Sequence, residues 1–198
     1  MIHEYNQKII DVSAGGDTVV LQYLLSTAPG VNTKIDALWM AALSGKEGCV
    51  RLLIDSLQPL LVTDKDFAYQ ALLYAADGGN ASCVEQLLPF SIVERNTMAL
   101  KQAAKHGHVE CVRALIPVST PMFNSSEALR HAAKRGHNGC VDLLYAVSDP
   151  FEALQQLRIK HHDKEHQWGY LAQLCQRTVL EQAVSDVDLH ATIELRKI

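Results

Sequence analysis

Four of the five cysteines recur at one position of a repeated pattern, and thiols can be metal ligands or disulfide partners. Each of the four follows a glycine by four residues: Cys49, Cys83, Cys111 and Cys140. A metal site or a disulfide needs side chains that converge on one point, whereas equivalent positions of a repeat lie about one repeat apart. Free cysteine is among the most often buried residue types, so we predict a ladder of buried, unpaired thiols. Cys175 lies outside the pattern. We expect it on an apolar helix and buried in the protein core.

The segment KHHDKEH, residues 160–166, has the highest density of potential metal ligands. On a helix, His162 and His166 would share one face, as would His161 and Glu165, because residues four apart are neighbours. Zinc sites need three or four protein ligands, and no third ligand follows at a recognisable spacing. We therefore favour a solvated polar hinge and expect no metal or other cofactor. A small metal-dependent hydrolase built on this segment stays open as an alternative.

No established catalytic motif is visible elsewhere. The sequence has no glycine-rich phosphate loop, no paired-carboxylate motif and no nucleophile elbow. We therefore predict that the chain is not an enzyme.

The elements that carry the cysteines form an internal repeat. ALKQAAKHGHVECVRAL at 99–115 and ALRHAAKRGHNGCVDLL at 128–144 are identical at ten of seventeen positions, at an offset of 29. Further copies begin at residues 37 and 71, with a weaker one at residue 8. One glycine marks each copy: Gly16, Gly45, Gly79, Gly107 and Gly136. Five of the six prolines recur once per unit, and we interpret these prolines as markers of the connections between copies: Pro29, Pro59, Pro89, Pro117 and Pro150.

Within one copy the pattern is helix, turn, helix. Leu100, Ala103 and Ala104 share one helix face, and a second apolar stripe follows Gly107, a residue type suited to ending a helix. We predict helices at 99–106, 109–116, 128–135 and 138–146, with strand in less than a tenth of the chain. Neither short helix could bury its apolar stripe alone, so neighbouring copies must stack.

These copies resemble the ankyrin repeat family, whose signature T-P-L-H-x-A-A-x-x-G-H they match in its second half. The Thr-Pro is absent, the histidine is replaced by Trp39, Leu73, Lys101 and Arg130, and the period is mostly 28–29 residues instead of 33. About four residues are thus missing from the connection that forms the family's β-hairpin. The resemblance implies that His108 and His137 form structural hydrogen bonds at the helix–helix turn.

We therefore expect an all-α helical solenoid of about five ankyrin-like repeats, with reduced or absent β-hairpins. The repeat array would span residues 1–149, and residues 1–32 would cap its N-terminal end. A degenerate repeat and helical C-terminal cap would follow in 150–198.

In the ankyrin frame, the two residues before each glycine lie on the concave binding surface, and the residue four positions before each pair shares that face. The resemblance therefore predicts these partner-binding residues: Trp39, Leu43, Leu73, Asp77, Lys101, Lys105, His106, Arg130, Lys134 and Arg135. The face is apolar and aromatic at one end and basic at the other. Residues 93–145 contain seven Lys and Arg against four Asp and Glu, a net charge of +3 within a chain of −4.

The function implied by the resemblance is non-enzymatic protein binding on the concave face. The compact repeat also resembles repeat proteins of intracellular bacteria, so an effector acting on a host protein is one form of this hypothesis. The basic end predicts a partner with an acidic surface. Phosphoinositide or nucleic-acid binding through the basic stripe is an alternative, although a stripe without interleaved aromatic residues is not typical of single-strand binding, and nucleic acid is not expected.

The composition, 48% hydrophobic and 20% charged, is that of a globular protein. The longest apolar run, residues 37–43, is far shorter than the ~20 residues that cross a bilayer. No secretory signal is visible at the N-terminus, and the odd number of cysteines favours a reducing compartment. We expect a monomeric cytoplasmic protein, and export into a host cell without a cleaved signal stays open.

Overall fold

The computed structural model describes residues 2–27, 29–160 and 166–195, and these residues form pairs of antiparallel helices. The first helices of the pairs are α1 (Ile2–Gly15), α3 (Val31–Leu43), α5 (Lys65–Asp77), α7 (Val93–His106), α9 (Phe123–Lys134) and α11 (Pro150–Lys160). The second helices are α2 (Thr18–Ser26), α4 (Glu47–Thr63), α6 (Ala81–Leu87), α8 (Val109–Leu115), α10 (Asn138–Tyr145) and α12 (Gly169–Leu195). Short 3-10 turns, η1 (Leu88–Phe90) and η2 (Ile116–Val118), follow α6 and α8.

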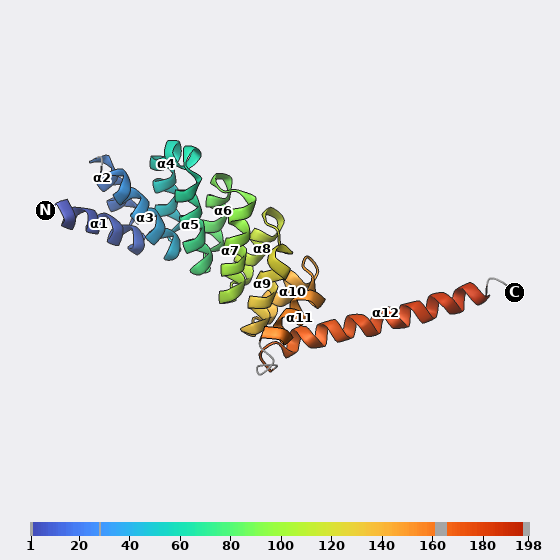
Figure 1. Cartoon of the computed structure of the whole chain (residues 1–198). Helices are drawn as coiled ribbons and strands as arrows, with labels where there is room; N and C mark the ends of the chain where they lie inside the picture. The colour runs from blue at the N-terminus through green and yellow to red at the C-terminus, as the bar shows by residue number, and fades with distance from the viewer. Residues whose placement is uncertain (1, 28, 161–165, 196–198) are drawn as a thin grey trace.

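The helices form two layers. Each first helix packs on the next first helix, from α1 to α11, and the second helices from α2 to α10 pack in the same order. Figure 1 shows the first helices along one side of the elongated stack and the second helices along the other. The all-α solenoid predicted from the sequence is confirmed, because the described part of the chain contains helices and no β-strand.

The turn between the helices of a pair depends on a left-handed glycine. Gly107 ends α7 with φ 81°, a conformation that glycine adopts without a Cβ clash. The next residue, His108, donates its main-chain N–H to the carbonyl of Ala103 at 3.0 Å. This bond satisfies a carbonyl that the helix end would otherwise leave without a partner.

One continuous core runs between the layers. In four consecutive first helices, two adjacent alanines are buried, and α7 provides Ala103 and Ala104. Small side chains allow the helices to approach closely, and leucines such as Leu100 and Leu115 fill the space between the layers. The core extends from Ile9 in α1 to Cys175 in α12.

The connections between pairs are short, which explains the absence of hairpins in the described residues. Only Asp64 separates α4 from α5. Two first helices also begin earlier than predicted, at Val93 instead of residue 99 and at Phe123 instead of residue 128. Residues that were predicted to lie in the connections therefore belong to these helices.

Pro59 contradicts the prediction that every such proline marks a connection, because it lies inside α4. Its side chain is exposed, as is Asp55 one turn earlier, so the carbonyl that loses its intrahelical partner can be hydrated. Pro150 is the first residue of α11, a position where a missing N–H costs nothing. Of the other three, Pro29 lies between α2 and α3, and Pro89 and Pro117 lie in the 3-10 turns.

The C-terminal helices cover the last repeat. Helix α11 packs on α9 with Ala153, Leu154 and Leu157 buried, in the same way as the earlier first helices. Leu171 and Cys175 of α12 are also buried, and Figure 1 shows this helix continuing away from the stack.

Candidate functional site

Hydrogen bonds between repeats fix the turns that bear the predicted binding residues. The residue after the glycine of one repeat bonds to the carbonyl two residues before the glycine of the previous repeat. His108 Nε2 lies 2.8 Å from the Asp77 carbonyl oxygen, and His137 Nε2 lies 3.1 Å from that of Lys105. The structural role that the resemblance implied for these two histidines is confirmed.

Asn80 occupies the same position after Gly79 and makes an equivalent contact. Its Nδ2 donates to the carbonyls of Ala42 and Leu43, each at 2.8 Å. Asn80 was not predicted from the sequence, although its place directly after a repeat glycine was a usable signal. The three bonds hold the main chain of Leu43, Asp77 and Lys105 in register from one repeat to the next.

A hydrogen bond between a first helix and the following connection recurs at an offset of 29 residues. Thr97 Oγ1 accepts the main-chain N–H of Thr120 at 2.9 Å, and Ser126 Oγ accepts that of Asp149 at 2.8 Å. Both hydroxyl residues are buried near the N-terminal ends of α7 and α9. These bonds tie each first helix to the connection that follows its repeat.

All ten predicted binding residues lie on first helices or directly after one, and each is half-buried or exposed. We call the solvent side of α1, α3, α5, α7, α9 and α11 the first-helix face. The helices of this face bring neighbouring members of the set together: Leu73 and Asp77 of α5 line a hollow of about 270 Å³ with Lys101 of α7. The face is hollowed at its two ends as well.

At the N-terminal end, Trp39 forms part of the wall of a hollow of about 340 Å³. This Trp39 hollow is lined by Gln7, Ile10, Asp11, Ala14, Asp36, Trp39, Met40 and Tyr74. The Trp39 ring is held in place, because its Nε1 donates to the Phe67 carbonyl at 3.4 Å. Its centroid lies 6.1 Å from that of Tyr74, with the two ring planes tilted by 42°.

In the middle of the face, Asp77 is engaged by its neighbours. It accepts Gln102 Nε2 at 2.6 Å, and His106 Nε2 lies 3.2 Å from the same carboxylate oxygen. Burial lowers the pKa of His106, and the charges of Lys105 and Arg135 act in the same direction, which together outweigh the opposite effect of Asp77. His106 is therefore predominantly neutral at pH 7.

The basic stripe predicted from the sequence is partly neutralised by Glu127, a residue that was not among the predicted site residues. Lys101 Nζ lies 3.6 Å from one carboxylate oxygen of Glu127, and His131 Nε2 lies 3.6 Å from the other. Burial alone would raise the pKa of Glu127, but the hydrogen bond from Asn124 and the charges of Lys101, His131 and Arg130 together lower it. The i, i+4 spacing of Glu127 and His131 was visible in the sequence.

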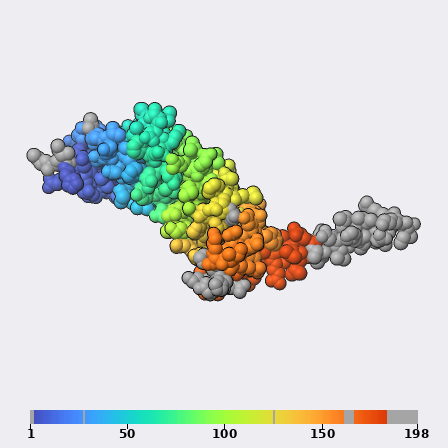
Figure 2. All heavy atoms as spheres, in the orientation of Figure 1, coloured from blue at the N-terminus to red at the C-terminus, as the bar shows by residue number. Residues whose placement is uncertain are grey.

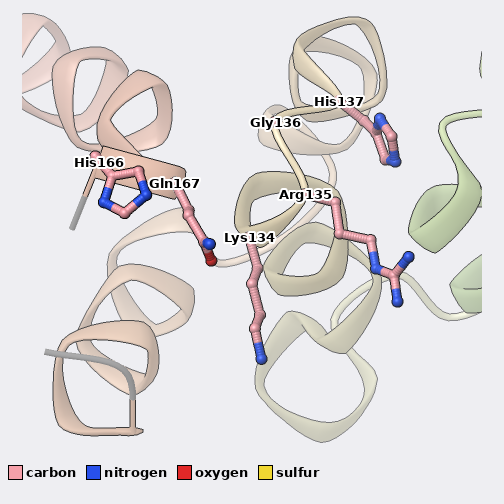
Figure 3. Close-up of a pocket in the computed structure, with 6 residues that line it drawn as sticks. All are labelled: Lys134, Arg135, Gly136, His137, His166 and Gln167. Atoms are coloured by element: carbon pink, nitrogen blue, oxygen red, sulfur yellow. The ribbon is translucent and has the colours of Figure 1, made fainter. Parts of the chain in front are cut away.

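The basic residues nearest the turns border the C-terminal hollow of the face. This hollow of about 590 Å³ is lined by Lys134, Arg135, Gly136, His137, His166 and Gln167. Figure 3 shows Lys134 and Gln167 entering this space from opposite sides, while His137 points towards the neighbouring repeat. The two ends of the first-helix face thus differ in charge.

The cysteines take no part in the face. All five are buried and free, as predicted for the ladder and for Cys175. Burial raises the pKa of Cys83, Cys111 and Cys140 to about 11, so these thiols stay protonated at neutral pH and are poor nucleophiles.

The possible metal site of the C-terminal segment falls mostly outside the described residues. His161, His162 and Glu165 belong to the part that is not described, and His166 is exposed at the edge of the C-terminal hollow. Among the residues that are described, no three His, Cys, Asp or Glu side chains are grouped so that they could hold a metal ion.

Comparison with known families gives one match. The family model for ankyrin repeats, with three copies, matches residues 9–96, 57–121 and 72–153. No curated protein matches the chain. No helix in the described residues has both the length and the apolar character needed to cross a membrane.

Proposed function

Because the chain belongs to the ankyrin repeat family, we propose that it is a non-enzymatic module that binds another protein across its first-helix face. Ankyrin repeats are in general protein-interaction modules. In the ankyrin family the corresponding face is the concave one. The ten residues from Trp39 to Arg135 are the proposed contact set. We also propose that the protein is monomeric and cytoplasmic. The resemblance to repeat proteins of intracellular bacteria suggests that it is an effector that acts on a host protein.

The observation that carries the proposal is the unequal first-helix face. A half-buried tryptophan borders a hollow at one end, and basic side chains border a hollow at the other. Trp and Arg are the residue types that most often dominate protein interfaces. Figure 2 shows these repeats as one continuous elongated surface, along which a partner could contact several units.

The buried cysteine thiols and the hydrogen-bonded histidines of the turns support a non-enzymatic role. The cysteines have raised pKa values, and His108 and His137 are bonded to main-chain carbonyls. These groups are therefore occupied with packing and inter-repeat contacts.

Affinity capture from lysate, followed by mass spectrometry, tests the proposal. Three baits are compared with the parent chain: Trp39→Ala, the pair Lys105→Glu and Lys134→Glu, and the control pair Arg51→Glu and Arg113→Glu. The control makes the same charge change at exposed residues of α4 and α8, in the second-helix layer. We expect the first two baits to lose proteins that the control retains. If all baits capture the same proteins equally, the first-helix face is not the binding surface.

A further inference from the structure

The Trp39 hollow is not only apolar and aromatic, as the sequence predicted for this end of the face. Trp39 and Tyr74 provide aromatic surface, and Ile10, Ala14 and Met40 provide apolar surface. Two carboxylates, Asp11 and Asp36, line the same hollow. Its volume of about 340 Å³ lies at the small end of the range for ligand sites, ~300–1,000 Å³.

Both carboxylates have capacity for a further donor. Asp11 is exposed and accepts Gln7 Nε2 at 2.9 Å, which uses one of roughly four lone-pair sites of the carboxylate. Asp36 is exposed as well. The lining of the hollow includes no lysine, arginine or histidine that would neutralise these two charges from within.

The aromatic surface is preformed. The long bond from Trp39 Nε1 to the Phe67 carbonyl orients the indole, and Tyr74 lies beside it at a tilt. A binding site whose side chains are already held in place loses less conformational freedom when a ligand enters.

Aromatic rings and carboxylates together suit a cation, and among protein side chains they suit arginine best. A planar guanidinium stacks on an aromatic face through a cation–π contact and donates several hydrogen bonds at once to carboxylates. The wider charge distribution points the same way. Residues 1–80 contain nine Asp and Glu against five Lys and Arg, a net charge of −4, in contrast to +3 over residues 93–145.

We infer that the Trp39 hollow binds an arginine side chain of the partner protein. This inference rests on the proposed function and deepens it. The N-terminal end of the first-helix face takes a basic residue, and the C-terminal end, with Lys134 and Arg135, takes acidic ones. Opposite charge preferences at the two ends permit one orientation of the partner and disfavour the reverse.

The test uses the full chain and needs no identified partner. Labelling with ¹⁵N gives two indole N–H signals in a correlation spectrum, one from Trp39 and one from the buried Trp168, which serves as the internal control. The probe is N-acetyl-arginine amide, and the matched neutral probe is N-acetyl-citrulline amide. We expect the arginine probe to shift the Trp39 signal saturably, the citrulline probe to act only weakly, and the Trp168 signal to stay in place.

Two carboxamide variants separate a specific site from general charge attraction. Asp11→Asn combined with Asp36→Asn should weaken arginine binding at least about tenfold, because charge-assisted hydrogen bonds are lost. Asp55→Asn removes an exposed carboxylate from the second-helix layer and should leave binding unchanged. Equal shifts with both probes, no shift with arginine, or full binding by the double variant would each overturn the inference.

The arginine titration and the capture experiment together separate this inference from the proposed function. If capture of proteins depends on Trp39 but the arginine probe does not shift its signal, the interface stands and the arginine site is wrong. If the probe binds as expected while the capture experiment shows no dependence on the face, the arginine site stands and the proposed interface is wrong.

Discussion

His108 of one repeat is hydrogen-bonded to the main chain of the repeat before it, with its Nε2 2.8 Å from the carbonyl oxygen of Asp77. The carbonyl can only accept, so Nε2 carries the proton. The position of the first-helix face therefore depends on side chains that hold one repeat to the next.

Replacing His108 should show how much this bond stabilises the array. His108→Ala removes the donor and should lower the free energy of unfolding by about 0.5–1.5 kcal/mol. His108→Asn should retain most of the stability, because Asn80 makes the equivalent bond. Urea unfolding followed by circular dichroism measures both. Equal stability of the alanine variant and the parent would contradict the role of this bond.

Two glycine substitutions separate backbone strain from a steric clash. Gly107 and Gly136 have φ values of 81° and 73°. A Cβ at Gly107 would lie 2.7 Å from His137 Nδ1, whereas one at Gly136 would meet nothing within 4 Å. Gly136→Ala should therefore lower the free energy of unfolding by about 1–2 kcal/mol, because alanine is strained in the left-handed conformation. Gly107→Ala should lower the free energy of unfolding further, because the His137 ring must also move away from its bond to the Lys105 carbonyl.

The double variant Gly107→Ala with His137→Ala provides the control for that clash. Its loss of stability should be smaller than the sum of the two single losses, since only the single glycine variant suffers the clash. Equal losses for Gly107→Ala and Gly136→Ala would show that contact with His137 has no energetic effect.

The cysteine ladder should react slowly in the native protein. Burial raises the pKa of Cys83, Cys111 and Cys140 to about 11, so these thiols should be almost entirely protonated at pH 7–8. Labelling with a chromogenic disulfide should therefore be slow and should accelerate when urea unfolds the chain. Cys111→Ser places a hydroxyl in an apolar layer and should lower stability by about 1–3 kcal/mol. Rapid native labelling of the ladder would show that its thiols are accessible.

Stability should fall as the pH drops below about 6.5. Burial, together with Lys101 and Arg130, lowers the pKa of His131 below its ordinary 6.5 despite the opposing effect of Glu127. The unfolded chain therefore takes up this proton first, and stability declines from pH 6.5 down to the folded-state pKa. His106 acts in the same direction. Glu127, with a lowered pKa, adds a further loss only below its ordinary value of 4.5.

Melting temperatures measured between pH 7.5 and 5 test this dependence. His131→Gln removes one of the responsible groups, so its melting temperature should change less with pH over this range than that of the parent. A steeper decline in the variant would mean that protonation of His131 stabilises the fold.

The two ends of the first-helix face should respond differently to mutation once a partner is in hand. Trp39→Ala should weaken binding by about 2 kcal/mol or more, if this residue dominates the interface. Lys105→Glu with Lys134→Glu should mainly slow association, and the effect should shrink at high salt, because exposed charges act by screened steering. Association rates at two ionic strengths, beside a circular dichroism melt of each variant, measure both effects. Parent-like binding by both variants would place the interface elsewhere.

The repeat pattern alone determined the fold. A glycine every 28–34 residues, an alanine pair on one helix face and a cysteine four residues after four of the five glycines are local signals, and each predicts a turn or a buried face within one repeat. The stacking of such units followed, because a short helix pair has no other way to bury its apolar side. The buried thiols were predicted from their equivalent positions in the repeat, and a strand content below a tenth was predicted from the shortened connections; the described residues agree with both.

The tertiary structure decided what the face presents. Glu127 partly neutralises Lys101 although 26 residues separate them, and Asp11 and Asp36, from two different helices, line the same hollow as Trp39. Pro59 continues α4 because its surroundings are solvent, a condition that the residue type does not reveal. Periodicity determines which side of a helix is buried, but the partners of an exposed charge depend on how neighbouring repeats are rotated and offset. That offset is set by packing and by bonds such as the one from His108 to Asp77.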